Sequence, residues 1–372
     1  MKIPFNNLFL QVEHNLGEYM QEIEDCIKNS SFIGGHQVET FEENFAKLNN
    51  SEFAVSCANG TDSLMLSMKA LDIKPGDEVI VPAMTWISTA ETVTACGAIP
   101  VFCDIDIETY TIDTSLIEEL INEKTVGIIP VHLYGHPCDM EKISQISDKY
   151  NLWIIEDCAQ AHLAEYKNKY VGTFGSFGSF SFFPGKNLGA FGDAGGIITN
   201  NESLAKSFTR YARHGGLIKG EHVIEGYNSR LDTLQAIILN KKMPLLQSWT
   251  NERRKISKQI SAGLNGTEGL VIPKESDNCK HSWHLYVVRV SNREEFSAYL
   301  KSKEISSGIH YPKALPFLKA YDYKNHSEKF KAFTYVDNKN MVHEFISSKM
   351  KLQEKKIELF RNFGSTSKIK SL

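Results

Sequence analysis

Short apolar runs alternate with amphipathic stretches between about residues 50 and 200. The runs are rich in Val and Ile and end in turns, which is typical of buried strands, and the stretches between them have helical spacing. The predicted strands are 52–57, 78–83, 99–105, 126–133, 152–158 and 195–200, and the predicted helices are 62–71, 88–97 and 139–151. Nearly continuous apolar strands that alternate with helices predict an α/β fold, in which a largely parallel sheet is covered on both faces.

The pattern changes near residue 230. The predicted elements are a long helix at 230–264 with a break near Pro244, a strand at 282–290, a helix at 293–305 and a short strand at 308–312. The break is expected because proline removes a helical hydrogen bond. This α+β order predicts a second, smaller domain, so that residues 1–240 form the large domain and residues 241–372 the small one.

Composition restricts the partners and the location of the protein. The net charge is −4 and no long Lys/Arg cluster occurs in residues 1–320, so neither nucleic acid nor an anionic membrane is expected as the main partner. No apolar run approaches the roughly 20 residues of a membrane span, and the N-terminus lacks the apolar core of a signal peptide. The seven cysteines are never spaced as Cys-x-x-Cys, which is typical of reduced thiols. A cytoplasmic protein without a metal site is therefore predicted.

Residues that could bind a ligand or take part in catalysis follow the predicted strands. Ligands of such sheets bind beyond the carboxyl ends of the strands. Gly60 and Thr61 open a helix after the first strand, where free N–H groups and the helix dipole suit a phosphate. Trp86 follows the second strand, and Asp157 ends the strand at 152–158. Each residue taken alone has a plainer explanation: a helix cap, a core aromatic or an ion pair.

Lys186 is the only cation in the stretch SFFPGKNLGAFGDAGG, residues 181–196. The stretch does not match a P-loop, because the glycine five residues before Gly185 is missing and Asn187 follows the lysine. It does not match a dinucleotide fingerprint either, because the glycine spacing differs. One ligand would use the lysine, an acidic partner, a phosphate site and an aromatic ring together. That ligand is pyridoxal 5'-phosphate, which needs a lysine for its Schiff base.

Several stretches resemble one family of pyridoxal-phosphate enzymes. The matching stretches are residues 58–64, 75–93, 130–135, 155–162, 179–200, 211–216, 228–238 and 309–312. In this order they resemble the DegT/DnrJ/EryC1/StrS family of sugar aminotransferases. The resemblance implies pyridoxal-phosphate fold type I, which is the fold of aspartate aminotransferase.

The resemblance also implies a role for each matching residue. Lys186 would form the Schiff base, Asp157 would pair with the pyridinium nitrogen, Gln160 would contact the ring hydroxyl, and Trp86 would stack on the ring. The phosphate would be held by Gly60, Thr61 and Ser181, joined by Asn228 of the neighbouring subunit. A homodimer with shared active sites follows from that last contact. The candidate contacts of the sugar nucleotide are Arg213, His214, Arg230, His310 and Tyr311.

The activity implied is transfer of an amino group from L-glutamate to a keto-sugar nucleotide, for amino-sugar biosynthesis. Relatives of one branch of the family are dehydratases with histidine in place of the lysine, so Lys186 favours transamination. A dTDP-linked 3-keto-6-deoxyhexose is the expected acceptor, and a 4-keto sugar is the alternative. UDP and GDP stay open as the nucleotide. A non-enzymatic binding or regulatory protein is the alternative of another class.

The C-terminus departs from the family pattern after about residue 320. Relatives close with a Leu-Pro segment and a final helix, whereas no proline follows Pro316 here. The stretch 341–360 predicts an amphipathic helix whose apolar positions are Val342, Phe345, Ile346, Met350, Ile357 and Phe360.

Overall fold

The computed structural model of the protein describes residues 3–324 and 341–344. A seven-stranded sheet in the order β1-β9-β8-β5-β4-β2-β3 forms its centre. The strands are β1 (Phe53–Cys57), β2 (Glu78–Pro82), β3 (Ile99–Cys103), β4 (Thr125–Ile128), β5 (Trp153–Asp157), β8 (Phe177–Ser181) and β9 (Gly195–Thr199). Neighbours from β3 through β8 pair in parallel, and β9 runs antiparallel to β8 and β1. The prediction of a largely parallel α/β sheet is confirmed.

Strand β8 is the one strand of this sheet that the sequence analysis missed. Its residues, FGSFS, include no β-branched side chain, so the usual strand signal is absent. Packing explains the glycine, because a Cβ at Gly178 would lie 2.5 Å from the Cα of Gly172. The close approach of another backbone therefore requires glycine at this position.

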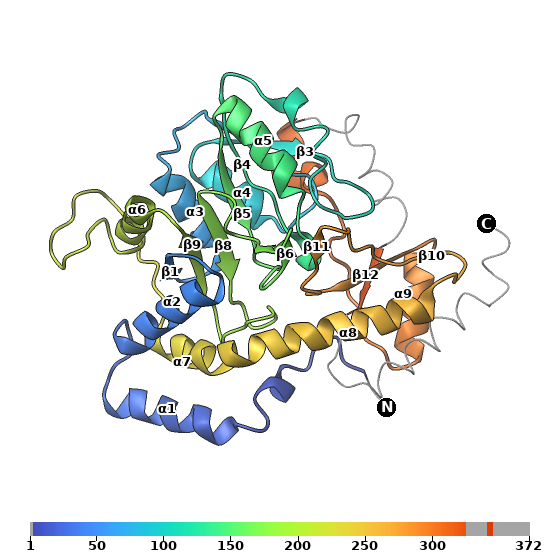
Figure 1. Cartoon of the computed structure of the whole chain (residues 1–372), viewed down its shortest axis with the longest axis horizontal. Helices are drawn as coiled ribbons and strands as arrows, with labels where there is room; N and C mark the ends of the chain where they lie inside the picture. Colours follow the sequence, from blue (N-terminus) through green and yellow to red (C-terminus); the bar gives the residue numbers. More distant parts are fainter. Residues whose placement is uncertain (1–2, 325–340, 345–372) are drawn as a thin grey trace.

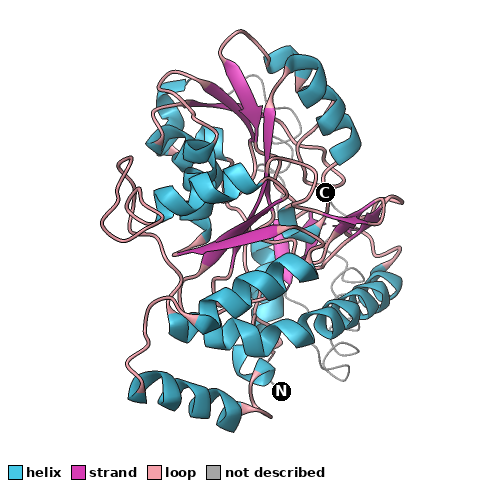
Figure 2. Cartoon of the chain, turned by 60° about the vertical axis from the view of Figure 1, so that its left-hand side comes forward, coloured by secondary structure: helices cyan, strands magenta, loops and turns pink. Residues whose placement is uncertain are grey.

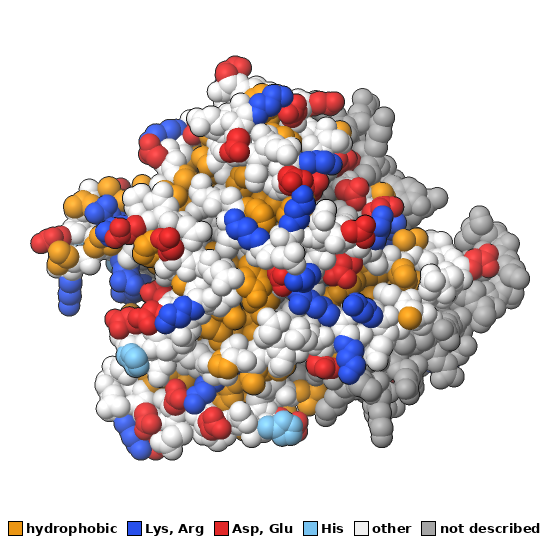
Figure 3. All heavy atoms as spheres, viewed as in Figure 1, with side chains coloured by type: hydrophobic (Ala, Val, Ile, Leu, Met, Phe, Trp, Pro, Cys, Tyr) orange, Lys and Arg blue, Asp and Glu red, His pale blue; other side chains and the backbone are white. Residues whose placement is uncertain are grey.

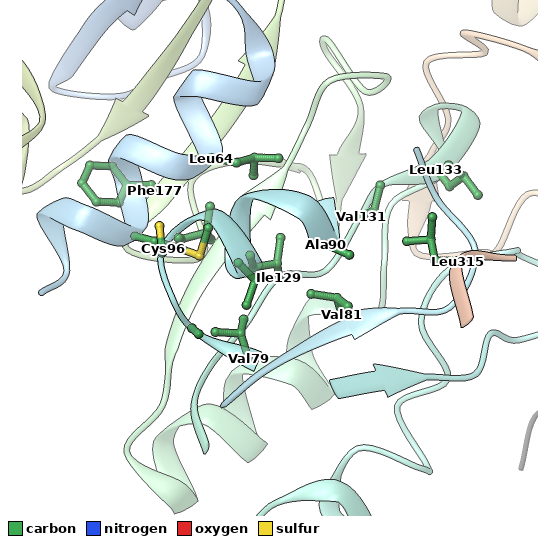
Figure 4. Packing of buried hydrophobic residues seen from close by; sticks show 14 of the residues in the cluster. Leu64, Val79, Val81, Ala90, Cys96, Ile129, Val131, Leu133, Phe177 and Leu315 are labelled. Carbon is green, nitrogen blue, oxygen red and sulfur yellow. The ribbon is translucent and has the colours of Figure 1, made fainter. Parts of the chain in front are cut away.

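Helices cover both faces of the sheet (Figures 1 and 2). On one face α3 (Gly60–Ala70), α4 (Ser88–Ala95) and α6 (Glu202–Ala212) pack against the core that Figure 4 shows, which includes Ile155. On the other face α2 (His36–Leu48), α5 (Met140–Tyr150) and α7 (Thr233–Lys242) complete two further clusters. Ile154 belongs to one of these, because successive strand residues point to opposite faces.

The long helix after residue 230 is broken at the predicted proline. Helix α7 ends at Lys242, a short 3₁₀ helix covers Met243–Leu245, and α8 (Leu246–Leu264) continues toward α9 (Arg293–Ser302) (Figure 1). Near α9 a small sheet in the order β10-β12-β13 is formed by β10 (Leu270–Val271), β12 (Tyr286–Val290) and β13 (Met341–Glu344). The division of the chain into domains at residue 240 stays a prediction.

The remaining elements are short or lie at the periphery. They are α1 (Leu16–Lys28), the strands β6 (Glu165–Tyr166), β7 (Lys169–Tyr170) and β11 (Cys279–Lys280), and the 3₁₀ helices Leu8–Gln11, Glu118–Leu120, Leu133–Gly135, Leu315–Phe317 and Lys319–Lys324. Near the N-terminus, Ile3 forms a parallel bridge with Ile305. The first described residues are therefore attached to the segment that follows α9.

Two predictions about the C-terminal third are wrong. Residues 308–312 do not form a strand; instead the Tyr134 hydroxyl donates to the His310 carbonyl and holds this segment as a loop. Met341–Glu344, which was expected to begin a helix, is strand β13, and it pairs with β12 with Val342 opposite Val288. The strand satisfies the backbone groups along the edge of β12, which explains why it replaces a helix there. The rest of the predicted helix, residues 345–360, lies outside the described residues.

Candidate active site

Asp157 lies at the carboxyl end of β5, where ligands of parallel sheets bind. Its side chain is 6% exposed. One carboxylate oxygen accepts from the Ala159 N–H at 3.1 Å, and the other accepts from the Thr89 hydroxyl at 3.0 Å. Burial raises the pKa of Asp157, while these hydrogen bonds and the Lys186 charge act against that rise. The carboxylate is thus a buried anion that a cationic partner would stabilise.

Glu156, the preceding residue, points to the other face of the sheet. Its carboxylate accepts from the N–H groups of Gly172, Phe174 and Gly175 at 2.7–2.9 Å. It also accepts from His132 Nε2 at 3.1 Å, because His132 Nδ1 is occupied as an acceptor of the Cys138 N–H. His132, Glu156 and Cys158 lie close enough to hold a metal ion. The ring nitrogens of His132 and the carboxylate of Glu156 are engaged in hydrogen bonds with each other and with backbone N–H groups. Burial also raises the pKa of the Cys158 thiol, so the arrangement fits a structural role rather than a metal site.

Lys186 lies in the loop between β8 and β9. The loop is closed by two backbone hydrogen bonds, from Lys186 N–H to the Phe183 carbonyl and from Ala190 N–H to the Phe182 carbonyl, both at 2.8 Å. Desolvation lowers the pKa of the half-buried Lys186 amine to about 8, and the Asp157 charge opposes this shift. The free amine is therefore far more populated at neutral pH than in an ordinary lysine.

The start of α3 and the end of β8 meet at Gly60 and Ser181. A Cβ at Gly60 would lie 2.6 Å from the Ser181 Cβ, so only glycine permits this approach. Asn59 caps the helix by accepting from the Asp62 N–H at 2.8 Å, and the Thr61 hydroxyl lies 2.7 Å from the Ser88 hydroxyl. The first N–H groups of α3 have no acceptor within the helix. Backbone donors and the hydroxyls of Thr61 and Ser181 thus form a cradle of the kind that binds phosphate.

Gln160, Tyr311 and Trp86 form a connected group beside Asp157. The Gln160 amide donates to the Tyr311 hydroxyl at 3.0 Å and accepts from the Tyr134 N–H at 2.7 Å. The Tyr311 ring lies 5.7 Å from the Trp86 ring, and Trp86 is 59% exposed. Trp86 is therefore not a core residue, and its exposed ring is available to stack on a planar ligand.

Histidines around Lys186 were missed by the sequence analysis, except for His310. Burial and the Lys186 charge lower the pKa of His162 to about 3, and they lower the pKa of His284 and of His310 as well. Neither ring nitrogen of His162 has a hydrogen-bond partner among the described residues. Thr89 was missed too, because a threonine at the start of a helix gives no signal that it contacts a carboxylate from a distant strand.

Arg213, His214, Asn228 and Arg230 lie apart from this cluster. They are exposed and belong to the segment between α6 and α7, in which Arg213 and Asn228 form an isolated bridge. The neighbouring Ser229 hydroxyl donates to Asp62 at 2.6 Å and accepts from the Ala58 N–H at 3.1 Å. The segment thus returns to the start of α3, and no hydrogen bond joins these four residues to Lys186 or Asp157 within the described chain.

Known proteins of similar sequence include transaminases and proteins with regulatory names. The dTDP-3-amino-3,6-dideoxy-alpha-D-galactopyranose transaminase of Aneurinibacillus thermoaerophilus is 43% identical over 310 residues, which cover 83% of this chain and 85% of the relative. A pleiotropic regulatory protein of Geobacillus stearothermophilus is 41% identical over 314 residues, 84% of each chain. In the part of the chain that the structure describes, no helix is both long enough and apolar enough to cross a membrane.

The fold has a close counterpart among solved structures. The structure of S. venezuelae DesV in complex with a ketimine intermediate superposes with a TM-score of 0.95 at 32% identity, and covers 98% of this chain and 99% of its own. The site residues described above fit pyridoxal phosphate, because they offer an amine, a buried carboxylate, an exposed ring and a phosphate cradle. The model of the DegT/DnrJ/EryC1/StrS aminotransferase family matches residues 15–358. The chain therefore belongs to this family of pyridoxal-phosphate-dependent aminotransferases.

Proposed function

We propose that this aminotransferase uses Lys186 as its catalytic residue and transfers an amino group from L-glutamate to a keto-sugar nucleotide. The observation that carries the proposal is that Lys186 and Asp157 lie close enough for each charge to influence the pKa of the other. A half-buried amine whose pKa is lowered to about 8 shares the mouth of the sheet with a buried carboxylate. Perturbed groups of this kind concentrate at catalytic sites.

Each residue of the cluster then has a defined task. The cofactor supplies an aldehyde and a ring that accepts electrons. Lys186 Nζ would hold the cofactor through its aldehyde, and as a free amine it would take a proton from the donor carbon that bears the amino group and give a proton to the acceptor carbon. About one Lys186 in ten is unprotonated at pH 7 when its pKa is about 8, against about one in two thousand for an unperturbed lysine. Positioned proton transfer contributes typically 10²–10⁴-fold to a rate.

The other residues would bind and orient. Asp157 would hold a proton on the ring nitrogen, since burial without a partner disfavours its charge. Gln160 would contact the ring hydroxyl and Trp86 would cover one face of the ring. The cradle of Gly60, Thr61 and Ser181 would bind the phosphate, because helix N-termini attract anions.

The proposed acceptor is a dTDP-linked 3-keto-6-deoxyhexose. The name of the Aneurinibacillus relative, a dTDP-3-amino sugar transaminase, supports amination at C-3. Arg213, Arg230, His310 and Tyr311 are the proposed contacts of the sugar nucleotide, since guanidinium groups suit a diphosphate. The test is to offer 3-keto and 4-keto sugars, each linked to dTDP and to UDP, with glutamate. Locating the new amine by NMR decides the position, and amination at C-4 alone would contradict the proposal.

We also propose that the active unit is a homodimer in which Asn228 reaches the neighbour's phosphate. Hydrophobic side chains are exposed on the segment that projects beside α6, at Leu217, Ile218, Val223 and Ile224 (Figure 3). Exposed apolar side chains gathered on a projecting segment are typical of an interface. Mixing inactive Lys186→Ala and Asn228→Ala chains should restore part of the activity, because a hybrid dimer has one intact site. Full activity of a monomer in sedimentation would contradict this proposal.

Reduction with borohydride tests the enzymatic proposal against a regulatory role. The purified protein should be yellow, and reduction followed by peptide mapping should find a pyridoxyl group on Lys186. A regulatory role is tested because the Geobacillus relative bears a regulatory name. A protein that takes up no pyridoxal phosphate would favour a binding or regulatory role instead. A cytoplasmic location remains a proposal that rests on the cysteine content.

A further inference from the structure

One face of α7 holds the loop that carries Lys186. Gln235 and Lys242 are seven residues apart on this helix, two turns, so their side chains emerge on the same face. The Lys242 ammonium donates to the Gly189 carbonyl at 2.7 Å, and Gln235 Oε1 accepts from the Phe191 N–H at 2.8 Å. Helix α7 thus forms hydrogen bonds with the loop at Gly189 and Phe191, three and five residues after Lys186.

Lys242 is an unusual residue for this position. It is 1% exposed, and the partners of its ammonium in the described part of the chain are neutral: the Gly189 carbonyl, the Gln11 side-chain oxygen at 3.3 Å and the Phe191 ring at 4.7 Å. No ion pair joins it to a carboxylate among the described residues. Burying an unpaired charge is costly, and a hydrophobic residue of similar size would often be at least as stable. Stability alone therefore does not explain a lysine here.

The two ends of the loop are in contact, so the position of Gly189 influences the position of Lys186. A Cβ at Gly189 would lie 2.3 Å from the Pro184 carbonyl oxygen, which shows that the two ends of the turn are in contact. The Ala190 N–H also donates to the Phe182 carbonyl. A shift of Gly189 would therefore displace the backbone of Pro184 and, with it, Lys186.

The continuation of α7 supports the other side of the loop. Asn187, which follows Lys186, lies with its side-chain oxygen 3.0 Å from His284 Nδ1. On α8, Arg254 donates to the His281 carbonyl at 3.1 Å and Arg253 donates to the Trp283 carbonyl at 3.3 Å. The helices α7 and α8 thus fix both the loop and the 281–284 segment that contacts it.

We propose that Lys242 and Gln235 are positioning residues that hold the 186–191 loop and thereby aim the Lys186 amine at the cofactor aldehyde. The inference rests on the proposed role of Lys186. It predicts that changes on α7 alter the rate of the chemical step more than substrate binding, because a misplacement of about 1 Å can cost ~10²-fold in rate.

The test compares two adjacent lysines of α7. Lys242→Met removes the donor to Gly189, while Lys241→Met removes a partly exposed lysine that pairs with Glu22 at 2.7 Å on α1. For Lys242→Met we expect kcat to fall by ~10–100-fold with little change in KM, and borohydride to trap pyridoxal phosphate on Lys186 more slowly. Lys241→Met should match the wild type in both measurements, and Lys242→Arg should recover part of the trapping rate, because guanidinium can still donate to the carbonyl.

Gln235 provides a second, independent pair of variants. Gln235→Leu loses the acceptor of the Phe191 N–H, whereas Gln235→Glu keeps an acceptor oxygen. We expect borohydride trapping to slow in the leucine variant only. If Lys242→Met does not fold, this pair of variants tests whether α7 positions the loop. Wild-type kcat and trapping in Lys242→Met, or in a folded Gln235→Leu, would overturn the inference. Wild-type turnover in Lys186→Ala would instead overturn the proposed function, so the two failures are distinguishable.

Discussion

The two faces of β5 use neighbouring carboxylates in opposite ways. On one face Glu156 is fully buried and accepts three hydrogen bonds from backbone N–H groups and one from His132, so its charge is already stabilised by donors of the protein. On the other face the Asp157 carboxylate accepts two hydrogen bonds within residues 3–324, from Ala159 and Thr89, and it shares its surroundings with Lys186. A saturated carboxylate stabilises the fold, whereas a partly satisfied one retains the capacity to bind a cation. The contrast separates a structural role from a catalytic one within two consecutive residues.

The largest effect is expected on the Asp157 face, at Lys186. Lys186→Ala should reduce kcat by ~10⁴-fold, because both the covalent attachment and the proton transfer are lost. Lys186→Arg should be equally inactive, since guanidinium does not deprotonate to attack an aldehyde. Steady-state kinetics and the loss of the visible absorbance band check this. Substantial turnover in the alanine variant would remove the catalytic assignment.

Asp157→Asn should have the second largest effect. A neutral amide cannot hold the ring nitrogen in its protonated form, so the electrostatic support of the proposed chemistry is lost. We expect kcat/KM to fall by at least ~10²-fold, with a small change in thermal stability. If Asp157→Asn instead unfolds the protein and leaves turnover per folded molecule intact, the roles assigned to the two faces are reversed.

Glu156→Gln should show the opposite result. The amide nitrogen would face a backbone N–H donor, so at least one buried donor would lose its acceptor, which costs about 1–3 kcal/mol. The free energy of unfolding should therefore decrease, as measured by denaturant titration. The kcat of the folded variant should remain within about twofold of the wild type. A large loss of kcat without destabilisation would show that Glu156 acts in catalysis.

The smallest effect concerns the titration of Lys186 in the cofactor-free protein. Its pKa is lowered to about 8 by desolvation and is held up by the Asp157 charge. Because the unfolded state binds more protons between pH 8 and about 10.5, Lys186 makes stability rise with pH in that window. Asp157→Asn should lower the pKa of Lys186 further, whereas Glu156→Gln should leave it unchanged. The pH dependence of acetylation at Lys186 measures this, and an inflection near pH 10 in the wild type would contradict it.

Local patterns in the sequence predicted most of the large sheet and the centre of the site. Val- and Ile-rich runs predicted β1 to β5 and β9, and helical spacing predicted α3 to α5, because these signals depend on neighbours along the chain. Residues at the ends of strands, such as Asp157, could be identified as candidate ligand contacts, because the carboxyl ends of parallel strands meet at one edge of the sheet. The specific roles of Lys186 and its partners came from the family resemblance.

What only the tertiary structure decided depends on contacts between distant residues. Strand β8 has no β-branched residue to mark it as a strand, and its Gly178 is required by the backbone of Gly172, which lies against it. Residues 308–312 form a loop and Met341–Glu344 a strand, because Tyr134 and β12 supply the hydrogen-bond partners. The sequence alone gives no role to Glu156 and does not distinguish Lys242 from Lys241. Their different roles follow from which donors, carbonyls and rings the fold brings to each side chain, and those partners lie far away along the chain.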